Sequence, residues 1–261
     1  MEKLIWEKDY INKIICGDCL EVMKGIPDES VDLVITSPPY NIEIDYGVYK
    51  DNLEWQEYLN WCNEWISQIK RILKSDGRFV INILVNIQKD NIRRQPLIDF
   101  SDLIRNNQLH IHGIGFWIDV TRVKYTSWGS WQSASCPYIY NPYEALVIGY
   151  RDYWKKNIKG QDTISKKNFI LGVRGIYNFG TTFNRNCPAV FPLKLPLVFV
   201  DLLSFEDDIV LDPFLGSGTT AVACKQLNRR FIGIEINPEY CKIAEKRLKS
   251  IPESLFNQET L

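Results

Sequence analysis

The residues of this sequence with the most evident chemistry form a tetrapeptide, Ser37-Pro-Pro-Tyr40, that follows a short apolar run, Val31 to Ile35. Ser37 carries a hydroxyl, Pro38 and Pro39 carry carbonyl groups without N–H donors, and Tyr40 carries a flat aromatic ring. A backbone stiffened by two prolines, with acceptors beside a ring, could hold a planar group and accept hydrogen bonds from its N–H groups. The alternative is a Pro-Pro strand terminator followed by a surface tyrosine.

A second candidate site lies near the C-terminal end, where a short predicted strand is followed by a glycine-rich turn at residues 213–220. Gly216 and Gly218 would let the backbone approach a ligand closely. Glu235 ends the next predicted strand, 17 residues after Gly218, where an acid commonly accepts hydrogen bonds from ribose hydroxyls. The turn lacks both the GxGxxG pattern of dinucleotide sites and the lysine of phosphate-binding loops. A nucleoside without phosphates, such as S-adenosylmethionine, fits this pattern better, and a plain tight turn is the alternative.

The elements that must position these residues alternate between strands and helices. Apolar runs that end in polar, Gly- or Pro-containing turns predict strands, and apolar residues at three- and four-residue steps predict helices. The predicted strands are 12–16, 31–35, 78–83, 209–212 and 231–235, and the predicted helices are 53–73, 97–106, 192–203, 221–227 and 238–250. This alternation is typical of an α/β fold with a parallel sheet.

The middle of the chain has a different composition. Residues 115–124 and 145–150 predict two further strands, joined by an aromatic, turn-rich segment. Residues 151–185 hold eight Lys and Arg against two Asp, a local net charge of +6, with aromatic residues between them. Such a mixture suits phosphates and stacked bases, although a solvated loop, and buried anchors for the tryptophans, are the alternatives. The candidate nucleic-acid contacts here and in the preceding aromatic segment are Trp128, Trp131, Lys155, Lys156, Lys166 and Lys167.

Length and composition limit the class of protein. The chain has 261 residues and a formal net charge of −1, which suits one large domain and not a protein dominated by phosphate contacts. No apolar run approaches the roughly 18 residues of a membrane span. The charged N-terminus does not resemble a signal peptide, so we expect a cytoplasmic protein without a membrane contact. Cys16 and Cys19 have CxxC spacing, but the seven cysteines lack a second pair at zinc-ligand spacing, and we expect no metal.

Taken together, the motifs resemble those of the DNA amino-methyltransferases of restriction–modification systems, in the β arrangement with the catalytic half N-terminal. Ser37-Pro-Pro-Tyr40 resembles the catalytic motif, residues 212–218 (Asp-Pro-Phe-Leu-Gly-Ser-Gly) the cofactor loop, and Glu235 the ribose-binding acid. Cys16-Gly-Asp18 resembles the strand end that contacts the cofactor's adenine. Residues 187–192, Cys-Pro-Ala-Val-Phe-Pro, resemble the family's HPA-x-FP segment, with Cys187 in place of His.

The resemblance implies a Rossmann-like, seven-stranded α/β methyltransferase sheet with a circularly permuted motif order. Residues 1–85 would form the catalytic half, 86–186 the hairpin strands and an inserted target-recognition region, and 187–261 the cofactor half. The implied cofactor is S-adenosyl-L-methionine. The implied cofactor-binding residues are Asp18, Cys19, Thr36, Phe191, Asp212, Pro213, Phe214, Gly216, Ser217, Gly218, Thr219, Glu235 and Ile236, and the implied catalytic residues are Ser37, Pro38, Pro39 and Tyr40.

The implied reaction is methylation of an exocyclic amine in double-stranded DNA, on a base that flips out of the helix at a cost of about a few kcal/mol. Ser37 Oγ and the Pro38 carbonyl would accept hydrogen bonds from the amine, and Tyr40 would stack on the base. In the family, Ser at this position is associated mainly with N4 of cytosine and Asp with N6 of adenine, so we expect cytosine, with adenine as the alternative. A cognate restriction endonuclease is the implied partner, and the protein would be a monomer or homodimer.

Other classes of protein are less consistent with these motifs. A methyltransferase acting on RNA or on a protein amide is the more distant alternative; the release-factor type would have Asn before Pro-Pro and an upstream cofactor loop. The glycine pattern disfavours a nucleotide-dependent oxidoreductase. A DNA-binding module without activity would have no use for an intact cofactor loop.

Overall fold

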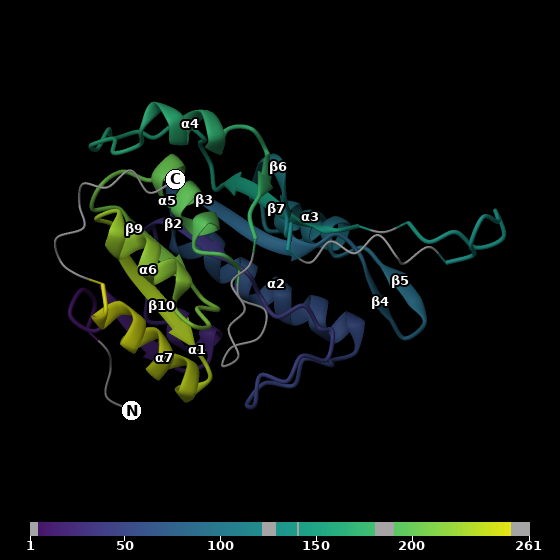
Figure 1. Cartoon of the computed structure of the whole chain (residues 1–261). Coiled ribbons are helices and arrows are strands. Elements are labelled where there is room, and N and C mark those ends of the chain that lie inside the picture. Colours follow the sequence, from purple (N-terminus) through teal and green to yellow (C-terminus); the bar gives the residue numbers. More distant parts are fainter. Residues whose placement is uncertain (1–4, 122–128, 140, 181–190, 252–261) are drawn as a thin grey trace.

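An eight-stranded sheet with the order β1-β10-β9-β2-β3-β7-β6-β8 is the framework of this fold (Figure 1). The computed structural model describes residues 5–121, 129–139, 141–180 and 191–251. The strands of the sheet are β1 (Lys13–Cys16), β2 (Val31–Thr36), β3 (Leu73–Leu84), β6 (His110–Ile118), β7 (Tyr143–Tyr150), β8 (Ile176–Asn178), β9 (Ile209–Asp212) and β10 (Arg230–Glu235). The five strands from β1 to β3 in this order are parallel, and β7 is antiparallel to both of its neighbours. The mostly parallel α/β sheet is confirmed, and β8 adds one strand to the seven expected.

The two ends of the chain meet within this sheet, as the permuted motif order implies. Strand β1 pairs with β10, so that Cys16 lies opposite Glu235. Strand β2 pairs with β9, so that Leu33 lies opposite Val210. Because the carboxyl ends of parallel strands meet at the same edge of a sheet, the segments that follow these four strands are brought together there.

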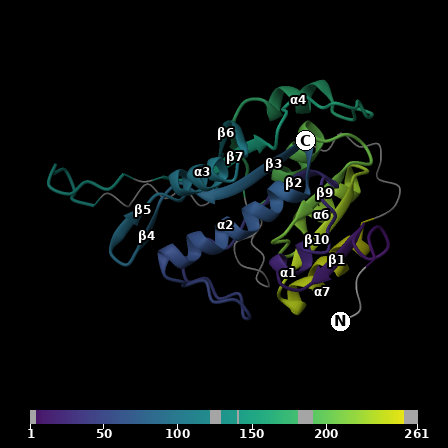
Figure 2. The same cartoon turned by 180° about the vertical axis from the view of Figure 1, so that it is seen from behind.

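Helices cover both faces of the sheet, and β2 is therefore buried at all six of its positions. Val31 and Val34 belong to the core beneath the first group of helices, and Leu33 and Ile35 belong to the core beneath the second. The first group is α1 (Cys19–Met23), α2 (Trp55–Ile72) and α3 (Pro96–Asn106); the second is α5 (Lys194–Leu203) and α6 (Thr219–Gln226), with α7 (Pro238–Lys249) packed beside α6. Figure 1 shows α6 and α7 in front, and Figure 2 shows α1 and α2.

Helix α2 follows from the predicted apolar stripe. Its buried side chains recur at three- and four-residue steps, and the carboxylate of Glu54 caps its first turn by accepting from two backbone N–H groups. The helix ends at Ile72, and β3 begins at once because Leu73 pairs with Val31. The predicted strand at 78–83 therefore began five residues too late.

Four short elements were not predicted, because three- to seven-residue segments carry little periodicity. They are β4 (Ile87–Lys89), β5 (Ile92–Arg94), α4 (Lys166–Gly172) and β8. Strands β4 and β5 form a separate antiparallel hairpin. This hairpin and residues 129–139 both extend away from the sheet on the same side of the molecule (Figure 1).

Candidate active site at the carboxyl edge of the sheet

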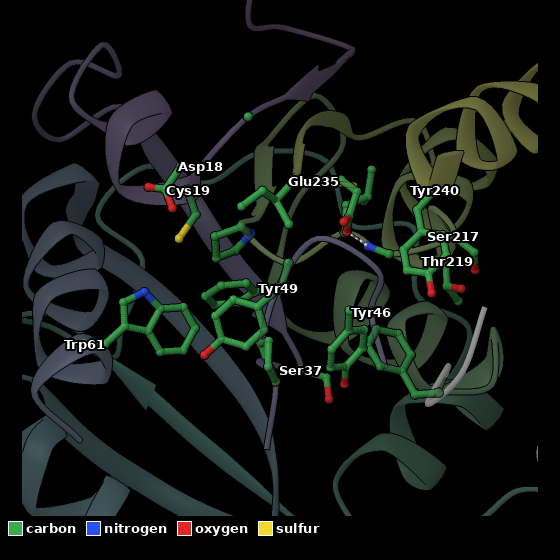
Figure 3. Close-up of a pocket in the computed structure, with 18 residues that line it drawn as sticks. Asp18, Cys19, Ser37, Tyr46, Tyr49, Trp61, Ser217, Thr219, Glu235 and Tyr240 are labelled. Atoms are coloured by element: carbon green, nitrogen blue, oxygen red, sulfur yellow. Dashed lines mark hydrogen bonds between the residues drawn. The ribbon is translucent and has the colours of Figure 1, made fainter. Parts of the chain in front are cut away.

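A pocket with an empty volume of about 880 Å³, partly open to solvent, lies where the carboxyl ends of β1, β2, β9 and β10 meet. Figure 3 shows Ser37, from the chain's N-terminal part, and Glu235, from its C-terminal part, on the walls of this one pocket. Ten of the thirteen expected cofactor-binding residues line it: Asp18, Cys19, Phe191, Pro213, Phe214, Gly216, Ser217, Thr219, Glu235 and Ile236.

Glu235 is held at the tip of β10 by two backbone hydrogen bonds. Its Oε2 accepts from the Gly216 N–H at 2.7 Å, and its Oε1 accepts from the Asn237 N–H at 2.8 Å. Burial raises the pKa of this carboxyl, and hydrogen bonds from the backbone of Asn237, Gly216 and Ile236 act in the opposite direction. Each carboxylate oxygen has a second lone-pair site. The group can therefore accept two further hydrogen bonds, as the two hydroxyls of a ribose require.

The two glycines of the cofactor loop have different functions. Gly216 lines the pocket and has φ +54°, and its N–H is held by Glu235. Gly218 has φ +86° and caps α6, and a Cβ at this position would lie 2.7 Å from the Cβ of Ala244 on α7. Gly218 is therefore needed for the close approach of α7. It is not among the residues that line the pocket, and its expected contact with the cofactor stays a prediction.

Thr36 and Asp212 also differ from expectation, because both are buried within the strand ends. Thr36 Oγ1 donates to Asp212 Oδ1 at 2.8 Å, and Thr220 Oγ1 donates to Asp212 Oδ2 at 2.6 Å. The Phe214 N–H also donates to Oδ1. With 1% exposure for each residue, these side chains join β2 to the cofactor loop and are not among the residues that line the pocket.

Asp212 predicts a measurable pH dependence of stability. Burial raises its pKa from the ordinary value of 3.8 to about 6, although the hydrogen bonds from the two threonines lower it. Because the folded protein binds this proton more tightly than the unfolded chain, the stabilisation is fully present below about pH 4 and is lost as the pH rises through about 6. We therefore expect the free energy of unfolding of the wild type, relative to Asp212→Asn, to decrease across this window in urea titrations. A difference that does not change with pH would contradict this assignment.

Asp18 directly precedes α1 and lines the pocket beside Cys19. Its Oδ1 accepts from the backbone N–H groups of Leu20 and Glu21, which makes it the N-cap of the helix. Burial raises the pKa of the Cys19 thiol to about 12. Cys19 is therefore a neutral wall of the pocket. Among the described residues, no group of three or more His, Cys, Asp or Glu is placed to hold a metal ion.

Six lining residues were not among the expected site residues, and most of them are aromatic. They are Gly17, Tyr46, Tyr49, Trp61, Leu215 and Tyr240. Tyr46 and Tyr49 lie in the segment after Ser37-Pro-Pro-Tyr40, which folds because Asp51 accepts from three backbone N–H groups, those of Asn41, Ile42 and Ile44. The cluster of aromatic residues soon after the tetrapeptide was the available signal.

The chemistry of the lining fits a cationic nucleoside without phosphates. None of the eighteen lining residues that the structure describes is Lys or Arg, the side chains that commonly pair with phosphates. Six are aromatic, and aromatic faces attract cations such as a sulfonium. Together with the carboxylate of Glu235, this lining matches the expected S-adenosyl-L-methionine.

Ser37 lies in a network of hydrogen bonds that sequence reasoning did not foresee. Its Oγ is 2.6 Å from the Tyr40 hydroxyl, which is 2.8 Å from Glu144 Oε2. The Asn82 amide nitrogen is 2.6 Å from the same carboxylate oxygen and 2.9 Å from the Tyr40 hydroxyl. Asn82 is a polar residue within an apolar strand, and Glu144 is a charged residue at the start of another. These two positions were the sequence signals for the network.

The remaining residues of the tetrapeptide are positioned as follows. Pro39 lines the pocket, and its carbonyl oxygen accepts from the Tyr58 hydroxyl at 2.8 Å, which ties the turn to α2. Pro38 is buried. Tyr40 is 8% exposed with its hydroxyl engaged, so that stacking on a base would have to use a ring face.

The structure does not bring the candidate lysines to the pocket. Thr163 contacts Asp201 and Arg229, at the amino ends of the parallel strands, and α4, which begins at Lys166, lies at that same end (Figure 1). Lys155, Lys166 and Lys167 are thus near the edge opposite Ser37. Lys156 is corrected as a DNA contact, because its side chain is 7% exposed and pairs with Asp32 and Asp208.

The remaining expected contacts lie partly beyond the described residues. Trp131 is 62% exposed on the projecting segment, whereas Trp128 lies outside the described residues. Cys187, which stands in place of the family's His, also lies outside them, and Phe191 from the same segment lines the pocket. In the described part of the chain, no helix combines the length and hydropathy needed to cross a membrane.

Comparisons with known proteins agree with this geometry. The family model described as DNA methylase matches residues 31–246. The chain is 36% identical over 182 residues to the Type II methyltransferase M.MjaVI of Methanocaldococcus jannaschii, covering 67% of this chain and 89% of the relative. It is 31% identical over 255 residues to the Type II methyltransferase M.HpaI of Haemophilus parainfluenzae, covering 91% and 74%. Its structure is similar to that of a DNA modification methylase of Thermus thermophilus complexed with S-adenosyl-L-methionine, with a TM-score of 0.73 and 27% identity over 92% of this chain and 94% of that one.

Proposed function

The chain belongs to the DNA methylase family, the amino-methyltransferases of restriction–modification systems, and we propose that it transfers a methyl group from S-adenosyl-L-methionine to N4 of cytosine in duplex DNA. The observation that carries the proposal is that Ser37 and Glu235 line one pocket. A hydrogen-bond acceptor for an amine thereby adjoins a carboxylate suited to the ribose of the methyl donor.

The residues of the pocket have distinct functions in this proposal. Glu235 accepts hydrogen bonds from the ribose, and Gly216 lets the backbone approach the cofactor. When bound, S-adenosyl-L-methionine would supply a methyl group on a cationic sulfur that keeps the bonding electron pair, and the proton lost by the methylated nitrogen would pass to solvent. Transfer then depends on positioning and electrostatics, without a covalent enzyme intermediate.

The target amine is made reactive by hydrogen-bond acceptors. The lone pair of the amine is conjugated with the base. Acceptors that take hydrogen bonds from its two N–H groups favour a pyramidal nitrogen, whose lone pair is free to react. Ser37 Oγ and the Pro38 carbonyl are the acceptors in this proposal, and the Tyr40 ring stacks on the base. Because the amine cannot be reached while the base is paired and stacked in the duplex, the base must flip out to enter the pocket.

The choice of cytosine rests on Ser37, because the family associates Ser at this position mainly with N4 of cytosine. The alternative is the same reaction on N6 of adenine, which presents a similar amine beside a ring nitrogen. Methylation of RNA or of a protein amide is the more distant alternative. Pocket shape contributes to the choice of base together with this one residue.

We propose that residues 86–186 recognise the DNA, because two of their segments, the hairpin β4–β5 and residues 129–139, project from the sheet. The hairpin β4–β5 carries Arg93, whose guanidinium lies over the ring of Tyr138 at 4.9 Å and so joins the two projecting segments. Trp131 is exposed on the second segment and available for stacking. A restriction endonuclease of the same system, and a monomeric or homodimeric state in the cytoplasm, complete the proposal.

One assay tests the function and the base together. We expect the protein, incubated with unmethylated duplex DNA of diverse sequence and labelled cofactor, to yield N4-methylcytosine after hydrolysis to nucleosides. Detection of N6-methyladenine alone would change only the assignment of the target base from cytosine to adenine. Transfer to RNA or protein but not to DNA would replace the substrate class, and no transfer to any of them would contradict the proposal.

A further inference from the structure

A carboxylate from a distant strand reaches the network around Ser37. Glu144 stands at the start of β7, opposite Leu84 of β3 and Trp117 of β6. Because β7 is antiparallel to β3, its start lies at the same sheet edge as the end of β2. Glu144 Oε2 is thereby 2.8 Å from the Tyr40 hydroxyl and 2.6 Å from the Asn82 amide nitrogen.

The carboxylate sets the direction of the hydrogen bonds that it receives. An ionised carboxylate only accepts, so the Tyr40 hydroxyl must donate to it. The Asn82 side chain must also turn its NH₂ group toward Glu144, since the reverse orientation would set the amide oxygen against the negative charge. The second hydrogen of this NH₂ group points to the Tyr40 oxygen, 2.9 Å away.

The direction of the Ser37 hydroxyl follows from these contacts. Tyr40 has one proton, and it is donated to Glu144, so its oxygen can only accept from Ser37 Oγ at 2.6 Å. Burial, and then the charge of Glu144, raise the pKa of Tyr40 well above its ordinary value, so the phenol keeps this proton. Ser37 has thus used its only donor. Its Oγ also lies within hydrogen-bond distance of the Asn82 amide nitrogen, at 3.4 Å, and its remaining lone pair is left for a group in the pocket.

We propose that Glu144 is a positioning residue that holds the Ser37 hydroxyl, through Tyr40, as an acceptor for the amine of the target base. The inference rests on the proposed function and adds a source of specificity to it. A serine with a free rotor could donate as well as accept. A serine held as an acceptor favours an exocyclic NH₂ and opposes a carbonyl oxygen, which distinguishes cytosine and adenine from thymine and guanine at this position.

The substitution Glu144→Gln tests this direction, because glutamine keeps the shape but can donate. A glutamine NH₂ can donate to the Tyr40 oxygen, which frees the Tyr40 proton for Ser37 and turns the Ser37 proton toward the pocket. We expect the single-turnover rate of DNA methylation to fall by roughly 10- to 100-fold, as is typical of partners that orient a functional group. Cofactor affinity, measured by calorimetry, should stay within about twofold.

A double-mutant cycle separates this function from a general structural one. In the Ser37→Ala background no hydroxyl remains to be oriented, so adding Glu144→Gln should change the residual rate by less than about twofold. Tyr40→Phe removes the hydroxyl that connects Ser37 to Glu144, so its single-turnover rate should match that of Glu144→Gln. This second variant keeps the test valid if one of the two folds poorly. Glu57→Gln, an exposed acid on α2, is the matched control with an unchanged rate.

The outcomes are distinguishable. A Glu144→Gln rate close to that of an active wild type would overturn this inference alone, as would an equal loss in the Ser37→Ala background. Absence of methyl transfer by the wild type would overturn the proposed function and this inference with it.

Discussion

Replacing Ser37 with alanine is expected to reduce the single-turnover rate of DNA methylation by roughly 10²- to 10³-fold, the usual effect of removing one hydrogen-bonding group aimed at the reacting centre. The alanine removes the acceptor that frees the amine's lone pair. Cofactor affinity should be retained, because Glu235, Gly216 and the aromatic walls are untouched. Rapid-quench measurements with saturating DNA and labelled cofactor give the rate, and calorimetry gives the affinity.

The control for this prediction lies at the other end of the same strand. Ser30 precedes β2, and its hydroxyl donates to the Pro27 carbonyl, far from the pocket. Ser30→Ala makes the same chemical change and should leave the rate unaltered. Ser37→Ala with wild-type turnover would refute the acceptor function, and a large loss of cofactor affinity would show that Ser37 acts mainly in binding.

Much of the fold was predictable because its signals are local. The strand of Val31 to Ile35, the stripe of α2 and the glycine turn before α6 each appear within a few residues. The resemblance then supplied the long-range pairing of β1 with β10, which periodicity alone does not contain. Strand β8 and hairpin β4–β5 were missed because their three-residue strands have no detectable period.

The residues of the candidate site were also predictable where their signals are local and not where they depend on long-range contacts. Ser37 directly follows β2 and Glu235 ends β10, so their positions follow from the sheet, and both line the pocket. Asp212 belongs to the cofactor motif, but a motif does not reveal that a side chain turns inward to Thr36 and Thr220. Its contribution is to join the two halves of the chain.

Long-range pairing also explains the error at Lys156. A run of basic residues in sequence suggests a charged surface. The partners of Lys156 are Asp32, more than a hundred residues earlier, and Asp208, in the C-terminal half. The aromatic cluster after the tetrapeptide was a signal for Tyr46, but only the folded chain places Tyr46 and Trp61 beside the cofactor loop.

Replacing Glu235 with glutamine should weaken the binding of S-adenosyl-L-methionine by about 100-fold or more. Both carboxylate oxygens accept a backbone N–H, from Gly216 and Asn237, so an amide NH₂ must face a donor at one of them. The variant thereby loses a charge-assisted bond within the loop and an acceptor for the ribose. Hydrogen bonds to charged groups contribute about 1.5–3 kcal/mol each, and 1.4 kcal/mol is tenfold in affinity. Calorimetric titration measures the change.

Glu239→Gln provides the control for this substitution, because Glu239 stands on the first turn of α7, four residues from Glu235, and pairs with Lys242 at the surface. The affinity of Glu239→Gln for S-adenosyl-L-methionine should equal that of the wild type. A Glu235→Gln affinity within about threefold of the wild type would refute the ribose assignment.

The pH dependence of cofactor binding gives a second criterion for Glu235. Burial raises the pKa of Glu235, so acidification should weaken wild-type binding at a higher pH than an ordinary glutamate would. In Glu235→Gln this proton-linked weakening should be absent, since the amide does not titrate, and its persistence would assign the effect to another group.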